Sequence, residues 1–254
     1  MGMRRVAVDL HVHTCLSPCA DLEMTPARIV GRAVDLGIGL MAVSDHNSAR
    51  NAGVAVELGQ RAGITVLPAM EITTAEEAHV LGVFPGMAEA LSMQERVYAS
   101  LPMGPEVVLH DAGHDGGHRW QVVVNAEDEV LDFERVMLLG ATDMDLGAAV
   151  AEIKARGGLA IASHLDRGAF SVMSQMGFVP GDVIFDAVEV IDEVLARTGL
   201  MFHPGMTMVR SSDAHHIQDF GRRRTVCRMA GASFEELSLA LMGAEGRAVE
   251  SIGG

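Results

Sequence analysis

Histidines and carboxylates that can hold metal ions stand at the ends of several apolar stretches of this sequence. The first stretch, Val6-Ala7-Val8, runs into Asp9-Leu10-His11-Val12-His13. Alternate side chains of a strand point to one face, so His11 and His13 are expected on the same side, about 6–7 Å apart along the chain. Two imidazoles placed in this way can bind one metal ion. A single pair of this kind is equally typical of polar residues that merely end a strand.

Four later apolar stretches end in the same kind of residue. The stretches at 41–43, 64–67, 159–162 and 207–209 lead, in that order, to His46, to Glu71, to His164, and to Asp213 with His215. A parallel barrel gathers the C-terminal ends of its strands on one rim, where its active site lies. Five such placements therefore predict one shared metal site. Imidazole and carboxylate ligands favour zinc, manganese or iron over magnesium.

The elements expected to carry these residues alternate between strands and helices. Thr25 and Pro26 are typical of an N-cap and a first helical residue, and they predict a helix over 27–36. Further helices are expected over the ranges 48–61, 87–100, 145–156 and 234–242. This alternation implies an α/β protein with a mostly parallel sheet. Residues 85–140 break the rhythm, and we expect an insertion there, with a lid around 104–120.

Length and composition fit one large domain over residues 1–254, with 49% hydrophobic residues to form its core. The net charge of −15 argues against a broad surface for nucleic acid. No segment reaches the roughly 18 consecutive apolar residues of a membrane span. The chain enters its first strand directly after Arg4-Arg5, without an apolar leader. We therefore expect a cytoplasmic protein, in which Cys15, Cys19 and Cys227 are reduced thiols.

Four short motifs, taken in order, resemble those of the polymerase and histidinol phosphatase (PHP) family. They are Asp9-Leu10-His11-Val12-His13-Thr14, Ser44-Asp45-His46-Asn47, Ala162-Ser163-His164 and Ser212-Asp213-Ala214-His215. The resemblance covers most of residues 6–84 and 158–216. It implies a distorted seven-stranded (β/α) barrel and a metal-dependent phosphoesterase with a three-metal site.

The resemblance also implies a set of nine metal ligands. The first ion would be held by His11, His13, Glu71 and Asp213, the second by Glu71, His79 and His164, and the third by Asp21, His46 and His215. Asp21 stands five residues before Pro26, the spacing found in the family, and Glu23 is its rival. His79 precedes its apolar run, so an ordinary loop histidine is the alternative there. Arg167 is a candidate to bind a phosphate in two contacts, with a structural salt bridge as the alternative.

We therefore predict a hydrolase that acts on phosphoric ester bonds and binds two or three divalent ions. A hydroxide that bridges two ions would attack the phosphorus of a small phosphomonoester or short nucleotide. The acidic charge and the single lysine argue against duplex nucleic acid as a partner. The lack of a long apolar segment argues against a membrane. A metal-dependent amidohydrolase is one alternative, although Lys154, in a predicted helix, is unsuited to a carbamylated bridge. A non-catalytic PHP-like module is the other, and the complete ligand set disfavours it.

Overall fold

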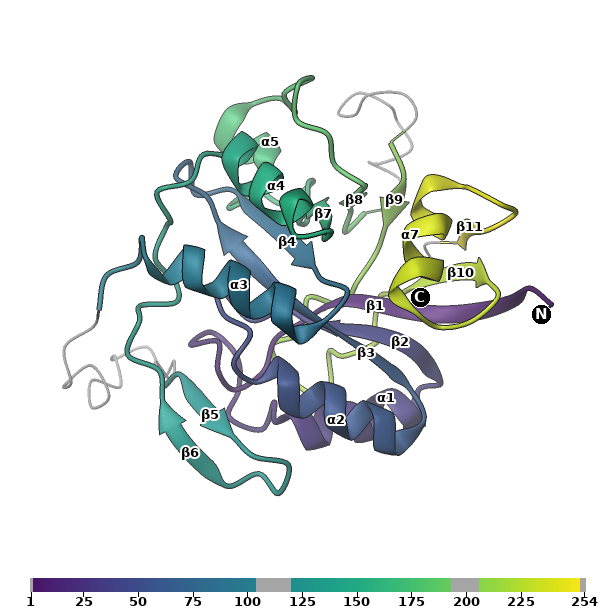
Figure 1. Ribbon diagram of the computed structural model, residues 1–254, viewed down its shortest axis with the longest axis horizontal. Coiled ribbons are helices and arrows are strands. Elements are labelled where there is room, and N and C mark those ends of the chain that lie inside the picture. The colour runs from purple at the N-terminus through teal and green to yellow at the C-terminus, as the bar shows by residue number, and fades with distance from the viewer. Residues whose placement is uncertain (1, 104–119, 193–205, 252–254) are drawn as a thin grey trace.

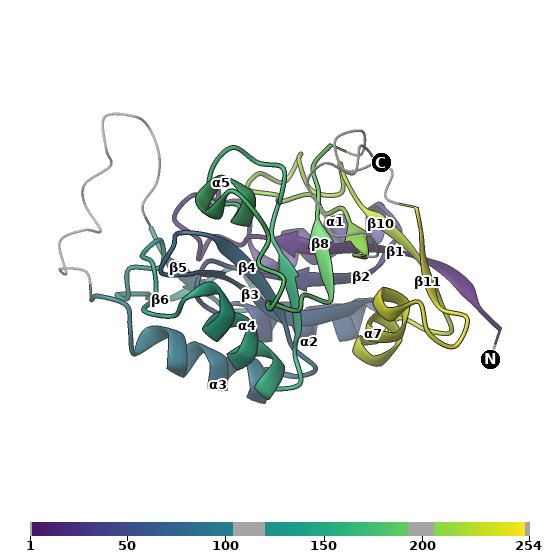
Figure 2. The same cartoon turned by 90° about the horizontal axis from the view of Figure 1, so that it is seen from above.

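A computed structural model describes residues 2–103, 120–192 and 206–251 of the chain. Within these ranges a nine-stranded sheet, in the order β11-β10-β1-β2-β3-β4-β7-β8-β9, curves into a nearly closed, barrel-like shape (Figures 1 and 2). Helices flank this sheet, so the predicted α/β class is confirmed. The distorted barrel expected from the motifs is confirmed as well.

Seven neighbouring strands of this sheet form the barrel. They are β1 (Arg4–Val12), β2 (Ile38–Val43), β3 (Thr65–Thr73), β4 (His79–Val83), β7 (Leu159–Ala162), β8 (Ala187–Glu189) and β9 (Met208–Val209). All neighbours pair in parallel except β4, which is antiparallel to β3 and to β7. A parallel bridge between Val12 and Ala214 links the end of β1 to the segment after β9. Two further strands, β10 (Thr225–Met229) and β11 (Ala248–Ser251), extend the sheet beyond β1.

Helices pack on the strands at the places that the sequence predicts. α1 (Pro26–Asp35) and α2 (Ala52–Ala62) lie side by side against β2 and β3, and α4 (Leu146–Ala155) lies against β4 and β7 (Figure 1). α3 (Met87–Tyr98) contacts β3, α5 (Val172–Met176) is short, and α7 (Phe234–Met242) packs on β10 and β11. The Thr25 side chain accepts a hydrogen bond from the backbone N–H of Arg28, which confirms it as the N-cap of α1. No helix in the described ranges is long and apolar enough to cross a membrane.

α2 begins four residues later than predicted because the polar residues before it bind other segments. Asn47 donates to the carbonyls of Leu138 and Gly140, and Asn51 donates to the carbonyl of Val122. The Asn51 contact holds the hairpin of β5 (Val122–Val124) and β6 (Val130–Phe133), and the Asn47 contacts hold the segment that follows it, all within the predicted insertion. Of the expected lid, residues 104–119 lie outside the described part of the chain.

The inner face of the barrel changes from apolar to ligand-bearing along each strand. On β3 the inward positions are Leu67 and Ala69, and the next position with the same orientation is Glu71. On β4 the same alternation connects Leu81 to His79. Apolar side chains therefore fill the interior below the rim, and candidate ligands stand above them.

A register shift near the end of β1 turns its two histidines inward. Val6, Val8 and Leu10 belong to the inner cluster, so a regular strand would direct His11 and His13 outward. The pairing of β1 with β2 shifts between Asp9 and Val12, and Val12 joins the outer cluster beneath the helices. The Asp9 side chain accepts hydrogen bonds from the backbone N–H groups of His11 and Ser212 at this irregularity. Irregularities of this kind often re-aim side chains beside functional sites.

Candidate metal centre

The rim of the barrel brings most of the predicted ligands together around one buried carboxylate, Glu71. Each of its oxygens is close to imidazole nitrogens from several strands. Oε1 lies 3.3 Å from His11 Nε2, 3.0 Å from His79 Nδ1 and 3.2 Å from His164 Nε2, while Oε2 lies 3.5 Å from His13 Nε2 and 3.2 Å from His46 Nδ1. The Glu71 side chain is 1% exposed. Five histidines that are distant in sequence thus surround one carboxylate.

His79 reaches this rim because β4 runs against its neighbours. In an antiparallel strand the first residue lies at the edge where the parallel neighbours have their last residues. His79, the first residue of β4, pairs with Thr73 at the end of β3. The ring of Phe170 stacks on it, with centroids 5.0 Å apart. The rule that ligands follow apolar stretches fails here for this topological reason.

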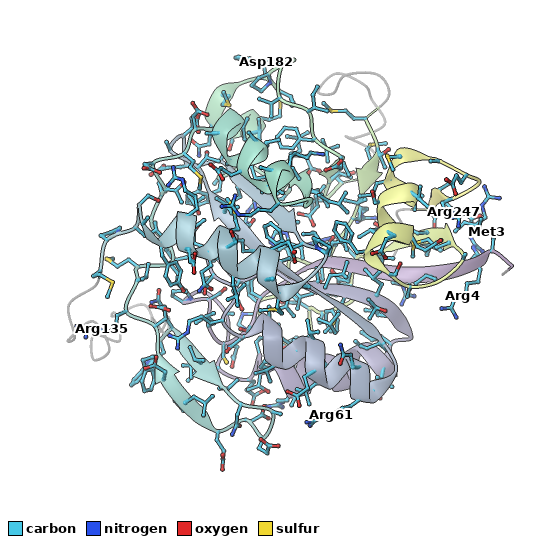
Figure 3. All side chains as sticks on the ribbon, viewed as in Figure 1. Met3, Arg4, Arg61, Arg135, Asp182 and Arg247 are labelled. Atoms are coloured by element: carbon cyan, nitrogen blue, oxygen red, sulfur yellow. The ribbon has the colours of Figure 1, made fainter. Side chains whose placement is uncertain are left out.

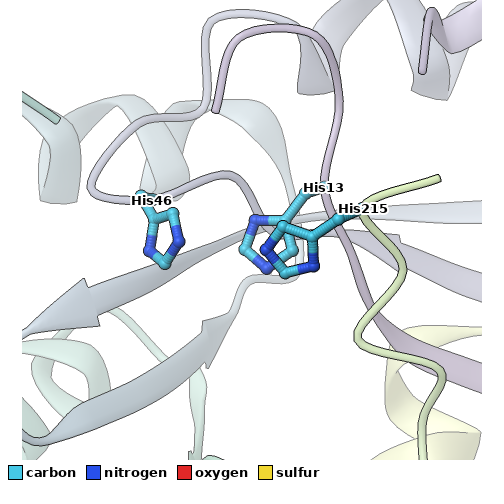
Figure 4. A group of neighbouring side chains, drawn as sticks. All are labelled: His13, His46 and His215. Carbon is cyan, nitrogen blue, oxygen red and sulfur yellow. The ribbon is translucent and has the colours of Figure 1, made fainter. Parts of the chain in front are cut away.

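Two further groups of ligand atoms adjoin the Glu71 carboxylate. Asp213 Oδ1 lies 3.4 Å from His11 Nε2 and 3.3 Å from His13 Nε2. In the second group, ligand atoms of His13, His46 and His215 all lie within 4.8 Å of one another (Figure 4). These residues come from the end of β1, the loop after β2 and the loop after β9.

Buried hydrogen bonds orient the ring of His13 toward the centre. The Ser17 hydroxyl donates to Asp45 Oδ1 at 2.7 Å, and its oxygen is 3.1 Å from His13 Nδ1. Because the serine proton is used by Asp45, His13 Nδ1 must be the donor, which leaves Nε2 as the acceptor, 3.0 Å from His11 Nε2. Asp45 therefore acts on His13 through Ser17.

Glu189 has the same role for His11, and the sequence reasoning missed it. Its Oε2 lies 2.8 Å from His11 Nδ1 and accepts a hydrogen bond from the backbone N–H of His164 at 3.0 Å. A carboxylate that fixes a metal-binding imidazole through its second nitrogen is a recurrent arrangement. Glu189 directly follows Ala187-Val188, at the end of a mostly apolar stretch interrupted by Asp186, so the strand-end pattern used for the other residues could have marked it as a candidate.

The charges of the cluster perturb its protonation. Burial alone would lower the pKa of His11, but the Glu189 and Glu71 carboxylates hold it well above the usual value. Burial and the nearby His215 lower the pKa of His13 to about 4, and burial lowers that of His46. Burial would raise the pKa of Glu71, yet His79 and His11 keep it well below the usual range. A negative carboxylate and several neutral imidazoles are therefore ready to bind cations.

The arrangement fits metal ions better than a hydrogen-bond network. Buried atoms of the cluster that lack a hydrogen bond include Glu71 Oε1, His46 Nδ1, His79 Nδ1 and both ring nitrogens of His164. A buried polar atom without a partner costs about 1–3 kcal/mol, so such a concentration calls for another partner. Two ligands that bind one ion at about 2.1 Å are separated by roughly 3.0–3.4 Å. The nitrogen–oxygen distances around Glu71 have this spacing.

Three of the residues singled out from the sequence lie at the edge of the cluster or away from it. The Asp21 side chain is 41% exposed, accepts from the N–H of Glu23 and lies 3.6 Å from His216 Nδ1. Glu23, its rival, is 60% exposed and forms an ion pair with Arg28. The structure brings neither carboxylate into the buried groups. Arg167 is 45% exposed at the rim, with Nη1 3.1 Å from Asp213 Oδ2.

Comparisons with known proteins agree with the fold and with the motifs. No family model matches the chain. The 5'-3' exoribonuclease Rnm of Salmonella typhimurium is 33% identical over 99 residues, which cover 35% of this chain and 33% of that protein. The chain thus spans about a third of the curated relative that it matches.

Solved structures share the fold over most of the chain. The lesion-specific endonuclease Q of Pyrococcus furiosus superposes with a TM-score of 0.72 at 17% identity, covering 97% of this chain and 58% of that one. A two-domain protein from Bacteroides vulgatus, which contains a predicted PHP-like metal-dependent phosphoesterase, has a TM-score of 0.50 at 15% identity and covers 94% and 63% of the two chains. The chain therefore shares the fold of these structures, and its four motifs resemble those of the PHP family.

These relatives correct one expectation drawn from composition. Duplex nucleic acid was excluded as a partner on the net charge of −15 and the single lysine. However, endonuclease Q, with this fold, has been solved in complex with a 27-mer duplex substrate, and Rnm is an RNA exonuclease. The exclusion is wrong because whole-chain charge does not measure the potential at one rim, where metal ions would dominate. Several arginines, such as Arg61, Arg135 and Arg247, lie at the periphery (Figure 3).

Proposed function

We propose that this chain is a metal-dependent phosphoesterase that hydrolyses phosphodiester bonds in nucleic acid. The observation that carries the proposal is the buried carboxylate of Glu71, surrounded by five histidines at the barrel rim, with several of the nitrogens unpaired. The PHP-type fold, the exoribonuclease relative and the endonuclease neighbours support the reaction class and the substrate class.

The residues present fit three adjoining ion positions that share ligands. His11, His13 and Asp213 would hold the first ion with Glu71, and Glu71 would bridge to a second ion held by His79 and His164. His13 is also close enough to join His46 and His215 around a third position. The nitrogen and oxygen ligands suit zinc, manganese or iron. When bound, two such ions would supply an ionised water near neutral pH and neutralise the charge on a phosphate.

The side chains around the cluster decide where a phosphate can approach. His11, Glu71 and His164 are at most 1% exposed, whereas the side chains of Asp213 and His215 are 12% and 23% exposed. The open side of the centre is therefore the side of the loop after β9. Arg167 stands there with its guanidinium on Asp213, and this cation is placed to bind a phosphate oxygen while Asp213 keeps it in position.

Phe170 supports a substrate that carries a base. Its ring stacks on His79 with one face, and the residue is 43% exposed. Its φ of 59° is an uncommon backbone conformation for a bulky residue, and strain of this kind clusters at functional sites. An exposed aromatic ring beside a phosphate-binding arginine is the combination that binds single strands, because each stacked base contributes about 1–3 kcal/mol.

The proposal is tested with protein reconstituted with Zn²⁺, Mn²⁺ or Fe²⁺. Substrates would be single-stranded RNA and DNA, a duplex with an abasic site and a small aryl phosphate. We expect strand cleavage, and we expect Phe170→Ala to lower kcat/KM on oligonucleotides by about tenfold or more. Phe178→Ala is the matched control, since Phe178 is an exposed phenylalanine that follows α5. Activity on the aryl phosphate alone would overturn the nucleic-acid substrate, and inactivity on all substrates would overturn the phosphoesterase.

The amidohydrolase alternative loses its best-known bridging ligand in this structure. Lys154, the only lysine of the chain, forms an ion pair with Asp186. Asp186 in turn accepts a hydrogen bond from the N–H of Ala160, near the beginning of β7, whereas His164 follows the other end of that strand. A carbamylated Lys154 would be at the wrong end of the barrel to bridge two ions.

A further inference from the structure

We propose that Arg223 is a positioning residue of the metal centre, which fixes the loop after β9 and thereby the direction of the Asp213 carboxylate. The inference rests on the proposed metal-dependent function and adds to it a residue outside the set of ligands. Arg223 lies between this loop and β10, and it acts through the backbone of the loop rather than on the ligand atoms themselves.

The first ion position lies across a seam between two segments of the barrel. His11 and His13 stand at the end of β1, whereas Asp213 follows β9. The two segments are joined by the bridge between Val12 and Ala214, in which the N–H of His13 donates to the carbonyl of Ala214 at 3.1 Å. Any movement of one segment against the other would change the distances between ligands of the same ion.

The guanidinium of Arg223 holds two consecutive carbonyls of the loop. Its Nε donates to the carbonyl of Ser211 at 3.1 Å, and its Nη2 donates to the carbonyl of Ser212 at 2.7 Å. Because the N–H groups of a planar guanidinium have fixed directions, such a pair of bonds sets orientation as well as distance. The Ser212 carbonyl belongs to the peptide unit that leads into Asp213. Fixing this unit therefore constrains the direction of the Asp213 side chain.

The backbone of Asp213 is in a conformation that needs such support. Its φ is 50°, in the left-handed region that few residues other than glycine adopt, although aspartate tolerates it better than most. The Asp9 carboxylate accepts from the N–H of Ser212 at 3.0 Å, at the opposite end of the peptide unit whose carbonyl binds Arg223 Nε. Asp9 also accepts from the N–H of His11. A carboxylate on β1 and a guanidinium before β10 thus hold the loop between them.

The arginines on either side of Arg223 have different partners. Arg222 is 68% exposed and forms an ion pair with Asp219. Arg224 donates to the carbonyl of Leu36, at the end of α1, at 3.3 Å. The three arginines carry the same charge to different places, and the paired contact with the ligand-bearing loop belongs to Arg223.

A change at Arg223 should therefore act on metal affinity. Without the guanidinium, two loop carbonyls lose their charged donor, and Asp213 is free to turn away from His11 and His13. Groups that orient metal ligands typically change affinity by about 10–100-fold when they are replaced, and we expect this loss in Arg223→Ala for the ion held by Asp213. Arg223→Lys should restore only part of it, because an ammonium group lacks the fixed fork of two donors.

The test measures zinc binding to the full chain by chelator competition, with elemental analysis for the number of bound ions. Arg222→Ala and Arg224→Ala are the matched controls, and both should keep the wild-type affinity. Since Arg224→Ala also removes a hydrogen bond to the backbone from the same segment, it reports any general loosening of that segment. Circular dichroism and chemical denaturation would verify that each variant is folded.

A double-mutant cycle with Asp213→Asn separates positioning from a general structural effect. If Arg223 acts through the Asp213 carboxylate, Arg223→Ala should lower zinc affinity much less in the Asp213→Asn background than in the wild type. A general loss of structure would lower it by the same factor in both. Arg223→Lys, which keeps the charge and most of the packing, replaces Arg223→Ala in the cycle if the alanine variant does not fold.

The possible failures are distinguishable. Equal factors in the two backgrounds, or wild-type affinity in the folded Arg223 variants, would overturn the positioning role and leave the proposed metal centre intact. A wild-type chain that binds no zinc, manganese or iron would overturn the centre itself.

Discussion

Glu71→Gln is the most informative perturbation of the centre, because one carboxylate faces five imidazoles at 3.0–3.5 Å. The amide has nearly the same shape, so the substitution removes charge and one acceptor while leaving the packing in place. Removing one partner of a buried charged pair costs about 3–5 kcal/mol. Since each 1.4 kcal/mol is tenfold in a binding constant, metal affinity should fall by roughly 10² to 4 × 10³-fold. Activity should be lost with it, because Glu71 is proposed to bridge two ions.

The assay compares metal content and metal affinity between this variant and a control variant. Elemental analysis and a chelator competition would give the number of bound ions and their affinities. Glu134→Gln is the matched control, because Glu134 is also buried and hydrogen-bonded but belongs to the network of Arg50 and Tyr98 beside the hairpin. Glu71→Gln with wild-type metal content and activity would refute the bridging assignment. Equal loss in both variants would show that the effect is general destabilisation.

Three further predictions concern protonation, orientation and backbone strain. The pKa of His11 is held well above its usual value in the metal-free protein, so metal must displace this proton. Affinity measured by chelator competition should therefore rise with pH until the pH passes that pKa, and a flat profile would contradict this. Glu189→Gln should weaken metal binding by about 10–100-fold with little change in fold, because the amide has nearly the same shape and alters the group that binds His11 Nδ1 and the backbone N–H of His164; unchanged affinity would remove its orienting role. Gly221 has a φ of 77°, and an added Cβ would lie 2.5 Å from Leu36 Cδ1. Gly221→Ala should cost about 1–2 kcal/mol in chemical denaturation from backbone strain alone, plus a further loss as Leu36 shifts, and so more than Gly243→Ala, where φ is 65° but the space is open.

The sequence predicted the elements with strong local signals. Caps such as Thr25 and Asp145 act within three residues, so the starts of α1 and α4 could be predicted closely. The ligands at strand ends could be predicted because a parallel barrel brings the C-terminal ends of its strands, which are distant in the sequence, together on one rim. The hairpin of β5 and β6 was not predicted, because its anchor is Asn51, some 70 residues away in the sequence.

Residues whose role depends on topology or on long-range contacts were harder to predict. The position of His79 depends on the direction of β4, which no local pattern encodes. Glu189 and Ser17 act through hydrogen bonds to His11 and His13. The strand-end pattern could mark Glu189 as a candidate, but the partner of each residue becomes visible only when the strands are assembled. For Asp21 the family spacing pointed to a ligand, yet the turn from Ser17 to Met24 directs its carboxylate toward the N–H of Glu23. Local backbone hydrogen bonding decided that orientation.

The distribution of exposure is compatible with the proposed action of an acidic chain on a polyanion. The carboxylates closest to the histidines, Glu71 and Glu189, are at most 2% exposed, so their charge is used by neighbouring imidazoles and by any bound cation. In the proposed function, a substrate would first meet Arg167, Phe170 and His215, which offer a cation, an aromatic ring and an imidazole. A protein that contacts a nucleic-acid strand at one phosphate needs few further cations. A protein that contacts a duplex over many phosphates needs many. Local charge at the open side of the barrel, rather than the total of −15, therefore governs which substrates can approach.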